Sequence, residues 1–193
     1  MNTLKSIAWA ASLFAATPAL AFDGSRQGFI LGLGIGLHNI NSDFIVNGAK
    51  VGSQSEGGVA TSFKIGGGVT DQLALYYVRN ASWYSAPYFD GFMSRDITYT
   101  IGLSGFGASY FLAPTAPSGY FLAAVGTGDI SAPFESNIRA DTGGAFMLGG
   151  GYEFNRNLMF EATLQATNIQ GSGSPPLTLK SSSLQFTINY LFY

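Results

Sequence analysis

Leu184-Gln185-Phe186-Thr187-Ile188-Asn189-Tyr190-Leu191-Phe192-Tyr193 places an aliphatic or aromatic side chain at every even position up to Phe192. The odd positions up to Asn189 are polar. Successive side chains of a strand point to opposite faces, so this pattern predicts a strand with one apolar and one mostly polar face. A sheet can span lipid only by closing on itself, because every backbone donor and acceptor must be paired there. We therefore expect the closing strand of a transmembrane β-barrel.

The composition supports lipid contact through strands. Charged residues make up only 10% of the 193 residues, against about 25% in typical soluble domains. Yet beyond residue 21 no uninterrupted apolar segment reaches the length of a membrane-spanning helix. The formal net charge of −2 provides no basic field for nucleic acid, and the absence of cysteine excludes thiolate chemistry.

Residues 1–21 are predicted to be a cleavable signal peptide. Lys5 precedes an apolar core from Ile7 to Ala16, and Ala19-Leu20-Ala21 forms a small-x-small cleavage site. The apolar core is too short for a membrane-spanning helix, which needs about 20 residues. Residues 22–193 are then expected to form a single barrel domain.

The first strand of that domain is the clearest. From Phe29 to Leu37 every odd position is apolar, while Gly32, Gly34 and Gly36 lie on the opposite face. Glycine weakens a strand but leaves room where strands curve around a narrow interior.

Further strands are predicted from the same alternation. They cover, approximately, residues 58–69, 73–77, 97–112, 120–126, 143–154, 160–167 and 184–192. Because Phe106 is out of phase with Ile97 to Leu103, we expect a bulge near Gly105 or Gly107. The phase of the strand at 120–126 stays open.

The connections are expected to alternate in length. Short ones fall at 70–72, 113–119 and 155–157, and long ones rich in Gly, Ser, Asn, Asp and Pro fall near 39–57, 79–95, 127–142 and 168–181. Short turns on one rim and long loops on the other are typical of membrane barrels. The sequence thus predicts an all-β, eight-stranded antiparallel transmembrane barrel with short periplasmic turns and four long extracellular loops.

Several motifs resemble those of the small Gram-negative outer-membrane barrels of the OmpA, OmpX, OmpW and opacity type. They are the glycine-alternating first strand, the turn at 66–71, the segment Gly149 to Phe154 with the Asn155-Arg156-Asn157 turn, and the aromatic C-terminus. The resemblance implies a monomer in the cell outer membrane that contacts outer-membrane lipid and lipopolysaccharide. It also implies recognition by the barrel-assembly machinery, and loops available to a host or cell-surface ligand.

The C-terminal residues match the assembly signal of these families. The signal would comprise Phe186, Ile188, Tyr190 and Phe192, with Tyr193 added beyond the usual last aromatic. Whether Phe192 or Tyr193 is the terminal signal aromatic stays open.

Charged and amide side chains on the polar strand faces form a predicted lumen polar cluster. Its members are Lys64, Glu153, Glu161, Gln185 and Asn189. Eight strands leave an interior that side chains nearly fill, so buried charges there must pair. One interpretation is an ion-pair cluster that plugs the lumen, and the other is a gated proton or ion path.

An aromatic-rich segment is expected in the second long connection. This predicted extracellular aromatic loop contains Trp83, Tyr84, Tyr88, Phe89 and Phe92. Such side chains can contact a partner or form an aromatic belt at the membrane boundary.

No catalytic residue, cofactor or metal site is predicted. His38 lies near Ser42 and Asp43, but a catalytic triad needs these groups to converge in space. Gly32-x-Gly34-x-Gly36 lies within a strand and does not match a dinucleotide-binding loop. We expect a non-enzymatic structural or adhesin-like protein. The alternatives are a narrow channel for small apolar or ionic solutes, as in OmpW, and less favoured, a lipid A-modifying enzyme.

Overall fold

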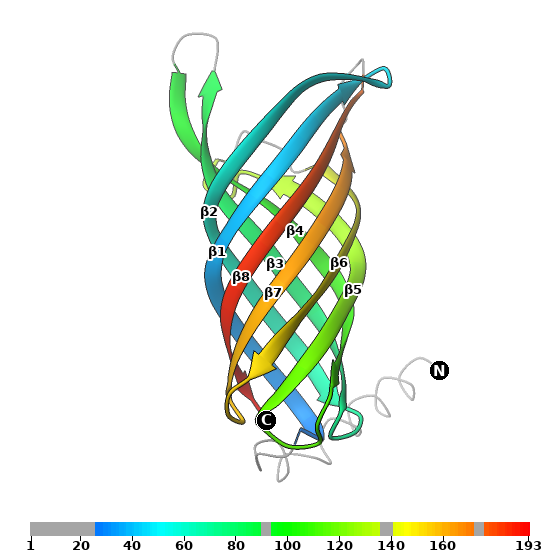
Figure 1. Cartoon of the computed structure of the whole chain (residues 1–193). Coiled ribbons are helices and arrows are strands. Elements are labelled where there is room, and N and C mark those ends of the chain that lie inside the picture. Colours follow the sequence, from blue (N-terminus) through cyan, green and yellow to red (C-terminus); the bar gives the residue numbers. More distant parts are fainter. Residues whose placement is uncertain (1–25, 90–93, 136–140, 172–175) are drawn as a thin grey trace, which may run out of the picture.

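The computed structural model describes residues 26–89, 94–135, 141–171 and 176–193. Each strand pairs antiparallel with the next, and the last pairs with the first, so the sheet closes into a barrel (Figure 1). The strands are β1 Gly28–Val46, β2 Ala49–Gly68, β3 Leu73–Phe89, β4 Ser94–Phe111, β5 Ser118–Ser131, β6 Asp141–Glu153, β7 Leu158–Gln170 and β8 Leu177–Phe192. The predicted eight-stranded antiparallel barrel is confirmed. The signal peptide expected at 1–21 lies outside the described residues and stays a prediction.

Within the described ranges, no helix has the length and apolar character needed to cross a membrane.

Apolar side chains form a belt around the outer wall. On β1, Leu33, Ile35 and Leu37 are 53%, 65% and 68% exposed, whereas His38 and Ile40 on the inner face are buried. The same alternation continues on β8, where Phe186, Ile188 and Tyr190 are exposed. Exposed apolar residues of the other strands include Val59, Ile65, Leu75, Tyr77, Phe106, Tyr110, Phe121, Val125, Phe146, Leu148, Tyr152, Phe160 and Leu164. These residues continue the belt around the barrel.

The two ends of the barrel differ. Residues 69–72, 112–117 and 154–157 connect strands at what we call the turn end, where the predicted short turns are found. The opposite end, at the top of Figure 1, is called the hairpin end.

The prediction of a long loop at 39–57 is wrong. β1 and β2 run through this segment and meet at Asn47-Gly48, whose φ angles are 51° and 80°. Asn-Gly with positive φ at both positions is the favoured two-residue hairpin turn. The strands continue here because β1 stays paired with both β2 and β8 up to Val46, and the residues nearest the turn can be polar because they meet water.

The connection predicted at 79–95 is also mostly strand. β3 extends to Phe89 and β4 begins at Ser94, and together they project beyond the barrel wall as a hairpin (green, Figure 1). Two connections at this end are longer, 132–140 and 171–176, but both are shorter than expected.

No bulge occurs in β4 near Gly105 or Gly107, because its pairing with β3 and β5 is unbroken there. Ile97, Ile101 and Leu103 face inward and are buried, so the apparent change of phase reflects an apolar lumen rather than an irregular strand. The register shift between β1 and β2 falls at Phe44/Ile45 instead. The open phase of β5 is settled by the inward residues Tyr120, Leu122 and Ala124.

Adjacent glycines of β6 differ sharply in the space around them. A Cβ on Gly143 would collide with the backbone carbonyl oxygen of Asn168 on β7. A Cβ on Gly144 would meet nothing within 4 Å. Gly143 therefore permits a close approach of β6 and β7, whereas Gly144 does not serve that purpose.

Gly143→Ala is expected to lower the free energy of unfolding by about 1–3 kcal/mol, because backbone must shift to admit the methyl group. Gly144→Ala, the matched control, should change it by less than about 0.5 kcal/mol. Urea unfolding of vesicle-reconstituted protein, followed by tryptophan fluorescence, measures both. Equal effects of the two substitutions would contradict the steric explanation.

Candidate functional site

The barrel interior is packed in layers. An apolar cluster that includes Ile30, Phe111 and Tyr120 fills the turn end, and a second one fills the hairpin end. The second cluster consists of Ile40, Ile101, Ile169 and Leu179. Buried polar side chains such as Asn80, Gln165 and Gln185 lie between the clusters, as expected where eight strands leave an interior that side chains nearly fill.

Lys64 of β2 and Glu161 of β7 form an ion pair inside the barrel. Their residues are 3% and 2% exposed, so both charges are removed from water. Tyr120 donates a hydrogen bond to Glu161 Oε1 at 2.8 Å. Lys64 Nζ also lies 5.3 Å from the ring centroid of Tyr76, within range of a cation–π contact. The pair is thus supported by aromatic side chains from two other strands.

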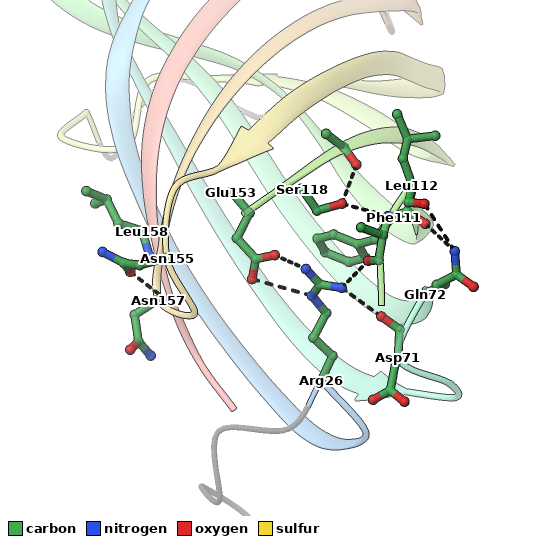
Figure 2. A network of polar contacts seen from close by, with 12 residues as sticks. Arg26, Asp71, Gln72, Phe111, Leu112, Ser118, Glu153, Asn155, Asn157 and Leu158 are labelled. Carbon is green, nitrogen blue, oxygen red and sulfur yellow. Dashed lines mark hydrogen bonds and ion pairs between the residues drawn. The ribbon is translucent and has the colours of Figure 1, made fainter. Parts of the chain in front are cut away.

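Glu153 does not join this pair, so the charged members of the predicted cluster belong to two separate ion pairs. Its carboxylate binds Arg26, a residue just before β1 that sequence reasoning missed (Figure 2). Arg26 Nη1 also donates to the carbonyl oxygens of Asp71 at 2.9 Å and Ala113 at 2.6 Å. The guanidinium carbon lies 4.2 Å from the Phe111 ring centroid.

Arg26 therefore ties the turn end together. Asp71 belongs to the β2–β3 turn, Ala113 to the β4–β5 turn, and Glu153 ends β6. One signal could have indicated such a partner: Glu153 and Glu161 outnumber Lys64, so a closed lumen needs a second cation.

The last two aromatic residues lie on opposite faces of the barrel. Phe192 is 37% exposed on the outer wall, whereas Tyr193 is 3% exposed and belongs to the apolar cluster at the turn end. Burial raises the pKa of the Tyr193 phenol, and the nearby carboxylate of Glu153 raises it further. Tyr193 is therefore part of the packing that plugs the turn end, together with the apolar cluster and the Arg26–Glu153 pair. Phe192 continues the outer series of Phe186, Ile188 and Tyr190.

Gln185 and Asn189 lie inside the lumen, both less than 2% exposed. Gln185 Nε2 donates to Ser82 Oγ at 3.1 Å, and Asn189 Nδ2 donates to Thr187 Oγ1 at 2.9 Å. Neither contacts the charged pairs directly through a described hydrogen bond. Oδ1 of Asn80 and Oε1 of Gln185 are buried without a hydrogen-bond partner in the part of the chain that the structure describes.

Little space remains around the central ion pair. The cavity bordered by Lys64, Glu161, Tyr76 and Tyr120 has a volume of about 10 Å³. A vestibule of about 240 Å³ opens at the turn end, next to Arg26, Glu153 and Arg156. The ion pairs thus separate this vestibule from the upper lumen.

The predicted aromatic loop is not a loop. Trp83, Tyr84, Tyr88 and Phe89 belong to β3, and Phe92 lies outside the described residues. Trp83 is half-buried, donates a hydrogen bond to Thr61 Oγ1 at 2.8 Å, and has its ring centroid 6.4 Å from that of Phe134. Tyr84 instead packs against the inner apolar cluster at the hairpin end. Sequence reasoning missed the strand because polar and aromatic residues alternate irregularly there.

His38 forms no triad with Ser42 and Asp43. Its Nε2 lies 3.0 Å from the carbonyl oxygen of Trp83, which it reaches across Gly58. Ser42 Oγ contacts Ser181 Oγ at 2.8 Å, and Asp43 Oδ1 binds Lys50 Nζ at 2.6 Å. Across the described ranges, no group of three or more His, Cys, Asp or Glu residues could hold a metal ion.

Solved structures with a similar fold are outer-membrane barrels. Neisserial surface protein A is 12% identical with a TM-score of 0.50, covering 82% of this chain and 96% of its own. OprG of Pseudomonas aeruginosa is 13% identical with a TM-score of 0.49, covering 88% and 99%. Ail of Yersinia pestis is 13% identical with a TM-score of 0.48, covering 84% and 99%. No family model and no curated protein matches the sequence. At 12% identity, the likeness to Neisserial surface protein A shows the barrel fold alone.

Lys64→Met is expected to lower the free energy of unfolding by about 3–5 kcal/mol, because it leaves the Glu161 carboxylate buried and unpaired. Lys64→Met combined with Glu161→Leu should recover most of this loss, since an apolar pair of similar size removes both charges. Urea unfolding in vesicles measures each variant.

Lys50→Met provides the control for the Lys64 substitution. Lys50 and Asp43 form an exposed ion pair, with side chains 54% and 46% exposed, so the expected loss is less than about 1 kcal/mol. A double variant no more stable than Lys64→Met alone would contradict the assignment of the loss to the unpaired Glu161.

Proposed function

We propose that this chain is an integral outer-membrane protein with a structural and surface-interaction role and no enzymatic activity. The continuous apolar belt on the outer wall supports membrane insertion, because such a surface is stable only in contact with lipid. The filled lumen is the observation that carries the choice of role. It leaves the outer wall and the hairpin end as the surfaces available for function.

The proposed orientation places the turn end in the periplasm and the hairpin end outside the cell. The β1–β2 and β3–β4 hairpins then project outward from the membrane (Figure 1). These paired strands take the place of the expected long loops as the surfaces that would contact a host or cell-surface ligand. The outward aromatic series ending at Phe192 would serve as the assembly signal, and Tyr193 as part of the plug.

A narrow passage is the second candidate function. Asn80 Oδ1 and Gln185 Oε1 favour it, because they are buried with no hydrogen-bond partner among the described residues, and buried amides of this kind are usually hydrated. The ion pair of Lys64 and Glu161 and the apolar cluster at the hairpin end oppose it, because they interrupt any polar path along the lumen. The lipid A-modifying alternative is disfavoured by the separation of Ser42, Asp43 and His38 into unrelated contacts.

Purified protein in planar bilayers is expected to show no sustained ion conductance, because the inner ion pairs and apolar clusters obstruct the lumen. Current recordings at moderate voltage test this expectation. Discrete, reproducible conductance steps from the wild-type protein would instead favour the passage function.

Outer-membrane insertion is expected to give a heat-dependent shift in gel mobility, because folded barrels of this kind resist SDS until they are boiled. The shifted species should appear in the outer-membrane fraction of cells that express the full chain. Unchanged mobility on boiling, or recovery in the soluble fraction, would contradict membrane insertion.

Unaltered adherence of these cells to an epithelial monolayer after replacement of residues 44–51 by a short turn would contradict a role for that hairpin.

A further inference from the structure

A groove of about 580 Å³ crosses the outer wall over β6, β7, β8 and β1 near the hairpin end. Gly144 and Phe146 of β6, Ala166 and Asn168 of β7, and Lys180 of β8 contribute to its lining. Gly144, with no atom near its missing Cβ, leaves the groove open on one side. None of the residues that line it belongs to the ion pairs of Lys64 with Glu161 or Arg26 with Glu153.

The groove lies across the edge of the apolar belt. Along β7 the outward residues change from Leu164, which is 58% exposed, through Ala166 to Asn168. The outer face of β8 likewise changes from Leu184 through Ser182 to Lys180. One half of the groove therefore suits hydrocarbon, and the other half suits a polar group.

Lys180 provides an available cation at the polar half. It is exposed, and no salt bridge involving it is found among the described residues. Asp43, its partner in the β1–β8 register, is bound instead by Lys50 at 2.6 Å. Arg79, on the outer face of β3, is also engaged, since its Nη2 contacts Asp129 Oδ2 at 2.9 Å. Lys180 thus keeps an ammonium group for an external anion.

We infer that this groove binds a phosphorylated lipid of the outer leaflet, with lipid A as the occupant. A phosphate would contact the Lys180 ammonium and the Asn168 amide, and an acyl chain would lie over Ala166 and Phe146. The choice of lipid A over a glycerophospholipid rests on the proposed function, which places the hairpin end in the lipopolysaccharide-containing leaflet. The groove itself requires only an amphipathic anion.

Native mass spectrometry of the purified barrel in detergent, titrated with bisphosphorylated lipid A, tests the inference. Lys180→Gln should weaken binding about tenfold, the usual effect of losing one hydrogen bond to a charged group. Gly144→Trp should abolish binding by filling the groove, and the open space at this position allows the barrel to fold. Dephosphorylated lipid A should also bind the wild-type protein weakly. Its affinity should not exceed that of bisphosphorylated lipid A for the Lys180→Gln variant.

Two control variants make the same kinds of substitution at positions outside the groove. Arg156→Gln removes an exposed cation from the β6–β7 turn, and Ala123→Trp adds an indole to the outer face of β5. Both should bind lipid A as wild type does, and the heat-dependent gel shift of each variant reports its folding.

Equal affinity of Lys180→Gln and Arg156→Gln for lipid A would overturn the site. Tighter binding of phosphatidylglycerol than of lipid A would overturn the choice of occupant. Because these titrations use purified protein, they are independent of cell fractionation, which tests the outer-membrane location itself. Lys180→Gln alters an exposed side chain, so the site remains testable even if Gly144→Trp fails to fold.

Discussion

The pairing of β8 with β1 is the constraint on which the rest of this molecule depends. Once the sheet closes, each strand is paired on both sides within the barrel wall, and the wall has an inside and an outside with opposite requirements. Most outward side chains are then apolar, while the inward side chains, apolar or polar, must pack or pair within the lumen. The interior of eight strands is so narrow that side chains fill it, and any charge placed there needs a partner.

The inner charges meet this requirement by joining strands that are distant in the sequence. Glu161 and Lys64 connect β7 with β2 across the lumen, and Arg26 connects Glu153 with two turns of the same rim. These contacts therefore link distant strands and also occupy part of the lumen.

The sequence was sufficient to predict the barrel, its strand number and the inward position of Lys64 and Glu161, because all of these follow from a period of two. The sequence-based prediction failed where the strands depart from the pattern of apolar residues outside and polar residues inside. Beyond the belt both strand faces meet water, so the segment around Asn47 resembled a loop. At the hairpin end, apolar residues such as Ile101 face inward, so the alternation along the strand looks like a change of phase. Arg26 and the groove near Lys180 depend on neighbours far along the chain, which no local pattern shows.

The β1–β2 hairpin has a thermodynamic consequence for recognition. Its strands remain paired from the belt to Asn47-Gly48, so most of its backbone entropy is already lost when the barrel folds. A flexible loop would lose that entropy only on binding and would bind more weakly for the same contacts. A molecule that contacts this tip meets a preorganised surface at a fixed position beyond the apolar belt.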